Sequence, residues 1–310
     1  KMNLGIDFGA VNCKSNTGIV IPSKTKKIES LIGNEEYIEI DGKRYVFGIG
    51  EYEVDKDIKF HQSHFLPLVF ATICKSTTDI DNNVMLGLPL QHYKKHKQAL
   101  KELMQKNNNK EVTIKLHGKD AVKRRIILDN IDVFPEGLAI LYSLNSENLS
   151  KFDNRDMLIV DIGGSTTDVA LLEGKGLNRE IVKTHSVSYG MHNIYNEIKN
   201  YIKDNTEDKN ISLEKCERIL DKTFIHSVDG VDTDLTFLND ILLEGTVKIL
   251  KDIKLKFGND FKSANMLVCG GGSKHLYEYL KAVQPNAIKV ESITANAEGY
   301  KKVGDIKWNV

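Results

Sequence analysis

The sequence contains one segment that combines glycines, hydroxyls and carboxylates at close spacing: residues 161–168 read Asp-Ile-Gly-Gly-Ser-Thr-Thr-Asp. It lies between two apolar runs that predict buried strands. A tight turn after a strand directs successive backbone N–H groups toward one point and so forms an anion site. Ser165 and Thr166 can donate hydrogen bonds to phosphate oxygens, and Asp161 can orient a metal-bound water. A structural turn needs only one Gly or Asn, so this composition predicts phosphate binding.

A related segment begins the chain, where residues 7–14 read Asp-Phe-Gly-Ala-Val-Asn-Cys-Lys. Gly9 tolerates backbone angles and a close phosphate approach that a side chain would prevent. Lys14 can add a positive charge, and Asp7 at the strand end can hold a hydrated Mg²⁺. Taken alone, the segment fits a plain hairpin with a solvated lysine better than a ligand site.

A third glycine-rich segment, residues 270–273, reads Gly-Gly-Gly-Ser at a strand end before a helix. Three glycines let the backbone approach a flat ligand such as a nucleoside, and the helix N-terminus favours phosphate. A flexible strand-to-helix turn explains the same residues equally well. No G-x-G-x-x-G follows a strand, and no G-x-x-x-x-G-K-[ST] is present, so phosphate binding would have to be built from hairpins.

These segments form a weak internal repeat. Gly-Ile-Asp-Phe-Gly at residues 5–9 returns as Ile-Val-Asp-Ile-Gly-Gly at 159–164. Internal repetition reports architecture. We therefore expect two copies of a strand–turn–strand unit, each beginning its own domain, with the boundary in the polar stretch 148–156.

The elements that must position these residues follow from apolar periodicity and turn signals. Asp41-Gly42 between alternating apolar residues predicts a type I′ hairpin over 36–48. Pro135 is expected in the first turn of a helix, where its missing N–H has no cost. The other expected strands are 4–8, 16–22, 83–88, 112–116, 125–133, 157–162, 169–173 and 266–269, and the other expected helices are 91–107, 190–204, 211–223, 236–257, one from 274 and one from 295.

Composition excludes several classes. The 310 residues carry 43 basic and 43 acidic side chains, so the formal net charge is zero and nothing indicates bulk nucleic-acid binding. Four scattered cysteines suggest neither a zinc site nor a disulfide framework. The longest apolar stretch, 65–74, is too short to cross a bilayer and is interrupted by Pro67. With no secretory signal pattern at the start, we expect a cytoplasmic protein, and we expect its nine histidines at the surface.

The order of these motifs resembles the actin, sugar-kinase and heat-shock-chaperone ATPase superfamily. Within it the sequence looks most like the ParM-type bacterial actins that segregate plasmids. The resemblance rests on D-F-G-A-V-N-C-K at 7–14, V-M-L-G-L-P-L at 84–90, V-F-P-E-G-L-A-I-L-Y at 133–142, the two later glycine segments and A-N-A-E-G-Y at 295–300. It runs from the N-terminus to residue 300.

The resemblance implies an α/β actin-like fold of two similar domains, each with a mixed sheet flanked by helices, and a nucleotide cleft between them. Domain I would span 1–150, domain II 151–294, and a C-terminal helix at 295–310 would return to domain I. Gly137 and Gly299 would lie near the two crossings, where hinge motion is expected.

The resemblance also implies roles for individual residues, with ATP or ADP and Mg²⁺ as cofactors. Glu136 would polarise the attacking water with Asp161 as its companion, and Asp7 and Asp161 would lie near the metal. Without the resemblance, Glu136 would be read as a solvated or helix-dipole-stabilised residue. The residues expected to contact the nucleotide are Gly9, Ala10, Val11, Asn12, Lys14, Gly163, Gly164, Ser165, Thr166, Glu214, Lys215, Gly270, Gly271, Gly272 and Ser273.

The expected function is ATP-driven head-to-tail assembly into dynamic filaments, with a DNA-binding adaptor of the ParR type as the partner that contacts the plasmid. A small-molecule kinase of the same superfamily is the alternative, since it would share all the phosphate loops. Such a kinase would need an acceptor pocket with a catalytic carboxylate, which the sequence does not identify.

Overall fold

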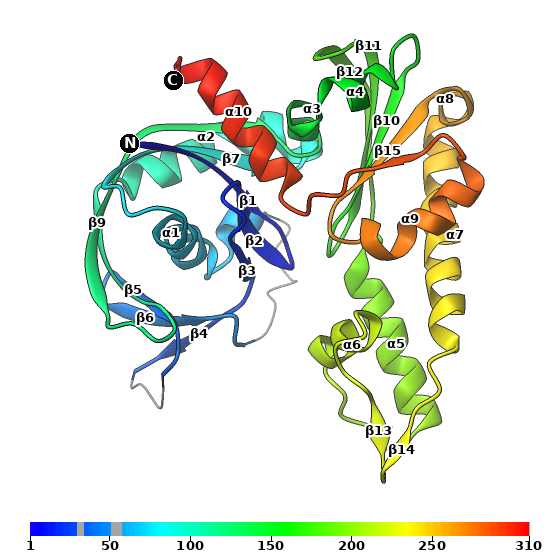
Figure 1. Ribbon diagram of the computed structural model, residues 1–310, viewed down its shortest axis with the longest axis horizontal. Helices are drawn as coiled ribbons and strands as arrows, with labels where there is room; N and C mark the ends of the chain where they lie inside the picture. Colours follow the sequence, from blue (N-terminus) through cyan, green and yellow to red (C-terminus); the bar gives the residue numbers. More distant parts are fainter. Residues whose placement is uncertain (30–33, 51–57, 310) are drawn as a thin grey trace. The chain divides into compact units, whose positions relative to one another are not determined.

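The computed structural model describes residues 1–29, 34–50 and 58–309, which group into two compact units (Figure 1). Unit 1 comprises 1–153, 175–178 and 292–310, and unit 2 comprises 154–174 and 179–291. Each unit is built on its own mixed sheet with helices packed against it. The expected α/β class, with two sheets flanked by helices, is confirmed.

Unit 1 contains a strongly curved mixed sheet. Among its described residues, nine strands pair in the order β3-β2-β1-β7-β9-β8-β5-β6-β4. The pairs β1–β7 and β7–β9 are parallel, and the pairs on either side of this centre are antiparallel. The strands are β1 Met2–Phe8, β2 Asn12–Ser15, β3 Val20–Pro22, β4 Thr25–Ile28, β5 Tyr37–Ile40, β6 Lys43–Phe47, β7 Asp81–Leu88, β8 Lys110–Lys115 and β9 Val122–Pro135.

The apolar stretch at 65–74 becomes helix α1, Phe65–Ser76, and the curved sheet wraps around it (Figure 1). Pro67 is the third residue of α1, where the backbone N–H has no helical partner to lose, so proline does not interrupt the helix. Because strands surround α1, most of its side chains are buried instead of one face only. The remaining helices of the first 153 residues are η1 Lys59–His61, α2 Leu90–Lys106, α3 Ala139–Ser143 and α4 Ser146–Ser150.

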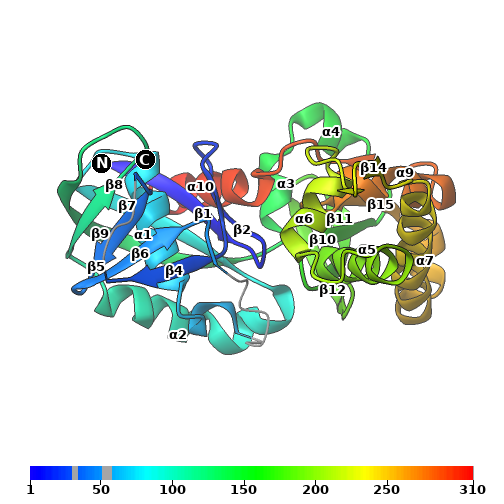
Figure 2. The ribbon, with the colours of Figure 1, turned by 90° about the horizontal axis from the view of Figure 1, so that it is seen from below.

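The last helix of unit 1, α10 Ala295–Trp308, runs beside β1 and packs against it through glycines (Figures 1 and 2). A Cβ on Gly5 of β1 would lie 1.9 Å from the Ala297 carbonyl oxygen. On the other side of α10, a Cβ on Gly299 would lie 1.8 Å from the Ala139 carbonyl oxygen. Both positions therefore need glycine for close backbone approach. The expected hinge at Gly299 stays a prediction.

Unit 2 contains a smaller mixed sheet. Five strands of its described residues pair in the order β12-β11-β10-β15-β16, with β10–β11 antiparallel and β10–β15 and β15–β16 parallel. Its strands are β10 Met157–Ile162, β11 Thr167–Lys175, β12 Asn178–Val187, β15 Asn265–Cys269 and β16 Ile288–Lys289, and a separate hairpin pairs β13 Ser227–Val228 with β14 Val231–Asp232.

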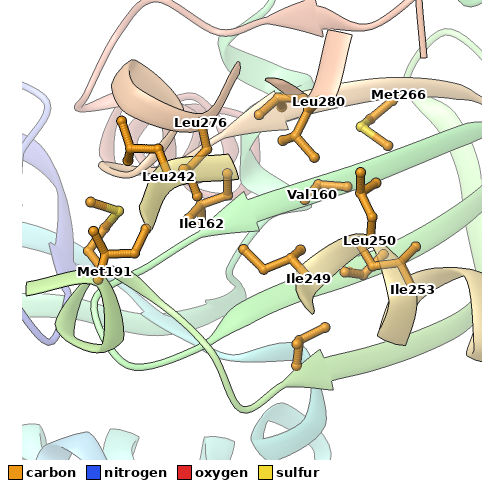
Figure 3. Close-up of a cluster of buried hydrophobic side chains, with 14 of the residues drawn as sticks. Val160, Ile162, Met191, Leu242, Ile249, Leu250, Ile253, Met266, Leu276 and Leu280 are labelled. Atoms are coloured by element: carbon orange, nitrogen blue, oxygen red, sulfur yellow. The ribbon is translucent and has the colours of Figure 1, made fainter. Parts of the chain in front are cut away.

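The helices of unit 2 bury apolar side chains against the sheet (Figure 3). Val160 and Ile162 of β10 meet side chains from three helices, among them Met191, Ile249 and Leu276. The helices are α5 Met191–Asn205, α6 Leu213–Leu220, α7 Phe237–Phe257, α8 Asn259–Ser263 and α9 Ser273–Val283. No helix in the described residues is both long enough and apolar enough to span a membrane.

Three local expectations are corrected. The single strand expected over 16–22 is two strands, β2 and β3, separated by a turn in which Gly18 has a φ of 85°. Pro135 ends strand β9 and does not begin a helix. The histidines are not all at the surface, because those buried by their neighbours are His64, His192 and His226. The type I′ hairpin is confirmed, since Asp41 and Gly42 both have positive φ.

Candidate functional site

The first glycine turn is a short hairpin loop between β1 and β2. Phe8 pairs with Cys13, and the Gly9 N–H donates to the Asn12 carbonyl oxygen at 3.0 Å. This arrangement puts Ala10 and Val11 at the tip, where neither backbone N–H has an acceptor among the described residues. Two amides at the tip of one turn are the donors that a phosphate needs.

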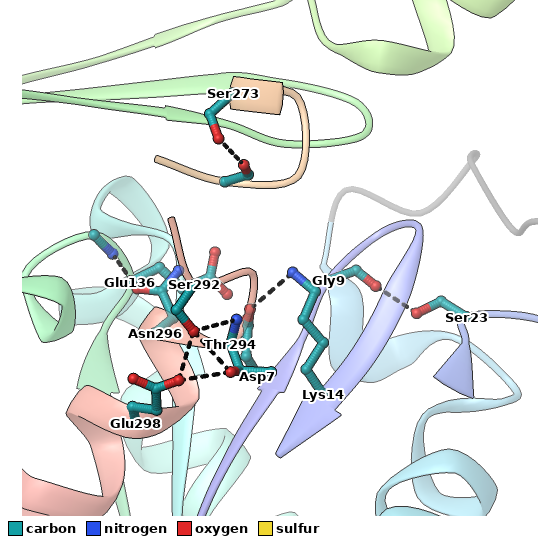
Figure 4. Close-up of polar contacts among 12 residues, drawn as sticks. Asp7, Gly9, Lys14, Ser23, Glu136, Ser273, Ser292, Thr294, Asn296 and Glu298 are labelled. Atoms are coloured by element: carbon teal, nitrogen blue, oxygen red, sulfur yellow. Dashed lines mark hydrogen bonds and ion pairs between the residues drawn. The ribbon is translucent and has the colours of Figure 1, made fainter. Parts of the chain in front are cut away.

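Strand β3 and its following residue brace this turn. The Ser23 hydroxyl donates to the Gly9 carbonyl oxygen at 2.6 Å, and the Ser23 N–H donates to the Val11 carbonyl oxygen at 2.7 Å (Figure 4). Asp7 and Lys14 lie opposite each other in the β1–β2 pairing, with 3.7 Å between the lysine Nζ and the Asp7 Oδ2. The strand pairing therefore holds a carboxylate and an ammonium beside the turn.

The second glycine turn, between β10 and β11, repeats this geometry. Ile162 pairs with Thr167, and the Gly163 N–H donates to the Thr166 carbonyl oxygen at 2.9 Å. Gly164 and Ser165 form the tip, and their N–H groups have no acceptor within the part of the chain that is described. Ser165 is exposed. The two turns are therefore equivalent, with Asp161 in the position of Asp7.

Helix α5 braces the second turn. The first two N–H groups of α5 donate to loop carbonyls, from Met191 to Gly163 at 3.0 Å and from His192 to Gly164 at 2.8 Å. His192 also approaches Ser165, with 3.4 Å between Nδ1 and Oγ. Burial lowers the pKa of His192 below its ordinary value, so the ring is neutral at pH 7.

The triple glycine after β15 packs on the end of β10. A Cβ on Gly270 would lie 2.3 Å from Asp161 Oδ1, and the Gly270 φ is 82°. The Gly272 N–H donates to the Ile162 carbonyl oxygen at 3.0 Å. A Cβ on Gly271, in contrast, would have no neighbour within 4 Å. Protein packing thus explains the glycines at 270 and 272, whereas Gly271 leaves open space for a ligand.

Ser273 has a structural position. Its hydroxyl donates to the Gly270 carbonyl oxygen at 2.8 Å, and the residue is buried (Figure 4). This bond closes the glycine turn at the start of α9. Ser273 therefore shapes the turn and does not present its hydroxyl to a ligand.

Glu136 directly follows β9 and is buried, with 7% of its surface exposed. The solvated, first-turn position is wrong, because Pro135 remains in the strand. The Glu136 N–H donates to the Leu88 carbonyl oxygen at 2.8 Å, and Lys59 contacts both carboxylate oxygens. Sequence reasoning missed Lys59, since nothing local marks a residue 77 positions away.

The turn after Glu136 is held by α10. The Asn296 Oδ1 accepts a hydrogen bond from the Gly137 N–H at 3.0 Å, and Asn296 lies close to Glu136 in Figure 4. Tyr300, fully buried, lies over Gly87 of β7, the strand that Glu136 joins through Leu88. The A-N-A-E-G-Y segment therefore fixes the backbone that presents Glu136.

Glu214 and Lys215 lie in the first turn of α6, and both are exposed. The Lys215 Nζ lies 5.7 Å from the centre of the Phe224 ring. The end of α6 is tied to the start of α9 by Asp221, which the His275 Nε2 approaches at 2.8 Å and Lys274 at 2.7 Å. Unit 2 thus brings α6 next to the helix that follows the triple glycine, a contact that no sequence motif signalled.

The donor set fits a nucleotide and a magnesium ion. The tip amides of both turns, and the open space at Gly271, suit phosphate and a flat ring. Mg²⁺ keeps several waters and uses one or two carboxylates plus phosphate oxygens, which Asp7 and Asp161 can supply. In the described residues no group of three or more His, Cys, Asp or Glu side chains is arranged to hold a metal. A dedicated all-protein metal cage is therefore not part of this site.

Comparison with known proteins identifies both halves of the chain. The family model for the N-terminal domain of actin-like proteins matches residues 5–138. The family model for the C-terminal part of the archaeal actin homologue MreB-like proteins matches residues 159–282. A search of curated proteins gave no match.

Solved structures agree over almost the whole chain. A 15-stranded ParM filament from Clostridium botulinum has a TM-score of 0.83 at 22% identity, covering 98% of this chain and 99% of that one. The archaeal actin homologue Ta0583 in complex with ADP has a TM-score of 0.84 at 17% identity, covering 99% and 100%. The Alp12 filament has a TM-score of 0.66 at 20% identity, covering 99% and 98%. The chain belongs to the actin-like proteins.

Proposed function

We propose that this protein binds Mg-ATP through its two glycine turns and hydrolyses it. The observation that supports this most directly is the repeated turn. Gly9–Asn12 and Gly163–Thr166 have the same closing hydrogen bond, the same tip of two backbone amides and an aspartate at the same strand position. One hairpin of this kind can be chance, but two equivalent ones fit a ligand that carries several phosphates.

Each side chain has a proposed role in hydrolysis. Phosphoryl transfer depends mainly on positioning and charge neutralisation. Lys14 would contact phosphate oxygens, and Asp7 and Asp161 would hold the water shell of Mg²⁺. Glu136 would accept a proton from the attacking water. Gly271 would lie against the adenosine, with Glu214 and Lys215 toward the base or ribose.

We further propose that the two units are actin-like domains I and II, with α10 returning to domain I, and that copies assemble head to tail. Two of the similar structures are filaments. Contacts that do not close on themselves give open filaments. We infer a cytoplasmic role in plasmid segregation, and because the net charge is zero, a ParR-type adaptor would carry the contact with DNA.

Sedimentation and light scattering with Mg-ATP, Mg-ADP or no nucleotide would test this proposal, with phosphate release followed in parallel. We expect assembly with ATP and disassembly as phosphate appears. Glu136→Gln should slow phosphate release by roughly 100-fold or more and prolong the assembled state. Glu111→Gln, which changes an exposed carboxylate of β8 in the same unit, is the matched control.

Other outcomes have clear meanings. A protein that stays monomeric with Mg-ATP over a wide range of concentration and salt would contradict assembly. Phosphate transferred to a metabolite instead of water would point to the small-molecule kinase. Equal rates for Glu136→Gln and the unchanged protein would remove Glu136 from the reaction.

A further inference from the structure

A lysine lies against the buried carboxylate of Glu136. Lys59, the first residue of η1, has its Nζ 3.0 Å from Glu136 Oε1 and 2.9 Å from Oε2. The Glu136 side chain is 8% exposed and that of Lys59 is 23% exposed. The contact is thus a two-point ion pair near the protein interior, between residues that are far apart in the sequence.

Burial alone would oppose the charge that Glu136 needs. Removing a carboxylate from water disfavours its ionised form, whereas a cation within hydrogen-bond distance favours it. Only the ionised form accepts hydrogen bonds through both oxygens and can take a proton from water. Contact with both oxygens also limits rotation of the carboxylate, since a rotated group would lose one of the two hydrogen bonds.

Other charged groups near Glu136 have partners of their own. Asp7 of β1 faces Lys14 of β2. Glu298 of α10 accepts hydrogen bonds from the Thr294 and Ser292 hydroxyls (Figure 4). Asp132 of β9 is paired with Lys97, Lys101 and Lys307. Lys59 is therefore the cation placed to act on Glu136.

We propose that Lys59 is a positioning residue for hydrolysis, which keeps the Glu136 carboxylate ionised and oriented toward the attacking water. This inference rests on the proposed role of Glu136. Lys59 does not itself need to touch the nucleotide. Its charge is the feature that matters, so arginine should replace it and an uncharged side chain of similar length should not.

Carbon-13 NMR of labelled glutamate carboxyls tests the electrostatic step without requiring catalysis. Glu136→Gln assigns the Glu136 signal, and the titration of that signal is then compared in the unchanged protein, Lys59→Met and Lys59→Arg. We expect the midpoint in Lys59→Met to move to higher pH by about one unit or more, as for loss of a close cation. Lys59→Arg should titrate like the unchanged protein. Equal midpoints in Lys59→Met and the unchanged protein would overturn the inference.

Phosphate release as a function of pH tests the catalytic step. In Lys59→Met we expect the acidic limb of the profile to move to higher pH, with a loss of roughly tenfold or more at pH 6.5 and a smaller loss at pH 8.5. Affinity for a non-hydrolysable ATP analogue should stay within about twofold, and Lys59→Arg should recover most of the activity. A loss that is equal at every pH would show a merely structural role and contradict the inference.

Two variants guard against general damage. Lys75→Met removes a comparable partly buried pair in the same unit, in which the Lys75 Nζ lies 2.8 Å from Glu36 Oε2. It should leave the pH profile unchanged. The double variant Lys59→Met with Glu136→Gln leaves no uncompensated buried charge, so it should fold at least as stably as Lys59→Met and hydrolyse no more slowly than Glu136→Gln alone.

These experiments separate the two proposals. If Glu136→Gln hydrolyses ATP like the unchanged protein, the proposed function of Glu136 fails. If Glu136→Gln is slow while Lys59→Met keeps an unchanged rate and pH profile, the inference about Lys59 fails by itself.

Discussion

The two glycine turns have the same internal geometry but are held in place differently. The turn at Gly9–Asn12 is braced by the hydroxyl of Ser23, which follows a third strand. The turn at Gly163–Thr166 is braced by the N-terminus of α5, whose first two amides bind its carbonyls. A brace can therefore differ while the turn it supports stays the same.

This difference has a physical reason. A carbonyl that faces away from the tip needs one donor, and a strand neighbour or a helix end can each provide it. The tip amides, in contrast, must remain without a protein partner if they are to bind phosphate. Selection for one ligand would then fix the tip and leave the brace to local topology. The experiments below test whether the two braces are equally important.

The largest effect is expected from Gly190→Ala, which attacks the brace of the second turn. A Cβ at Gly190 would lie 2.6 Å from the Gly164 carbonyl oxygen and 2.8 Å from that of Gly163, both backbone atoms. Neither can shift without displacing the turn, so we expect about 3 kcal/mol of destabilisation. Urea unfolding and the binding of a fluorescent ATP analogue would measure the loss.

Gly271→Ala is the matched control for this change. Its Cβ meets nothing within 4 Å, and its φ is not positive, so folding stability should be preserved. Its nucleotide affinity should still fall, because the open space is where we place the adenosine. Equal stability of the Gly190→Ala and Gly271→Ala variants would contradict the close packing of α5 on the turn.

A smaller effect is expected from Ser23→Ala, which removes the brace of the first turn. Ser23 is 1% exposed, and the change leaves the Gly9 carbonyl without its 2.6 Å hydrogen bond. We expect a loss of about 1 kcal/mol in the free energy of unfolding. The Ser23 backbone N–H still binds Val11, so nucleotide affinity should fall only a few-fold. A loss as large as that of Gly190→Ala would show that the two braces matter equally.

The smallest effect is a difference in acid sensitivity between the units. In unit 2, burial lowers the pKa of His192, and burial followed by the charge of Lys274 lowers that of His275. Unfolding restores values near 6.5, so the unfolded state binds more protons and stability falls as pH drops below about 6.5.

Unit 1 should respond at lower pH. Although burial opposes ionisation of Asp132, hydrogen bonds from Lys307 and the Val133 N–H and the charge of Lys97 lower its pKa. Its contribution is present above the unfolded value of 3.8 and is lost as pH falls through the lower folded value. His96 adds little because it is in contact with water.

Thermal unfolding between pH 7 and pH 5 can separate the two units. Trp308 of α10, the single tryptophan, reports unit 1 by fluorescence, and far-UV circular dichroism reports both units. We expect the circular dichroism transition to shift to lower temperature before the fluorescence transition. His192→Gln should reduce the shift. Coincident transitions at every pH would contradict the difference between the units.

Much of the fold was readable because it depends on local patterns. Apolar runs bounded by turn residues marked β1, β7, β10 and β15, and helical spacing marked α2, α5, α7 and α10 within a few residues. The Asp41-Gly42 hairpin followed from the positive φ that its turn requires. Local patterns were misleading at α1, where a short apolar run with Pro67 is a helix enclosed by the curved sheet. No window of sequence contains the strands that surround it.

The candidate site divides in the same way. The residue types at 7–14, 161–168 and 270–273 already indicated turns for phosphate, because glycine and hydroxyl groups have few other reasons to gather at strand ends. Tertiary structure alone separated Gly271, which has open space, from Gly270 and Gly272, which pack on β10. It also placed Lys59 on Glu136 and Asn296 on Gly137. Residue types depend on the chemistry of single positions, whereas these contacts depend on how strands and helices distant in sequence come together.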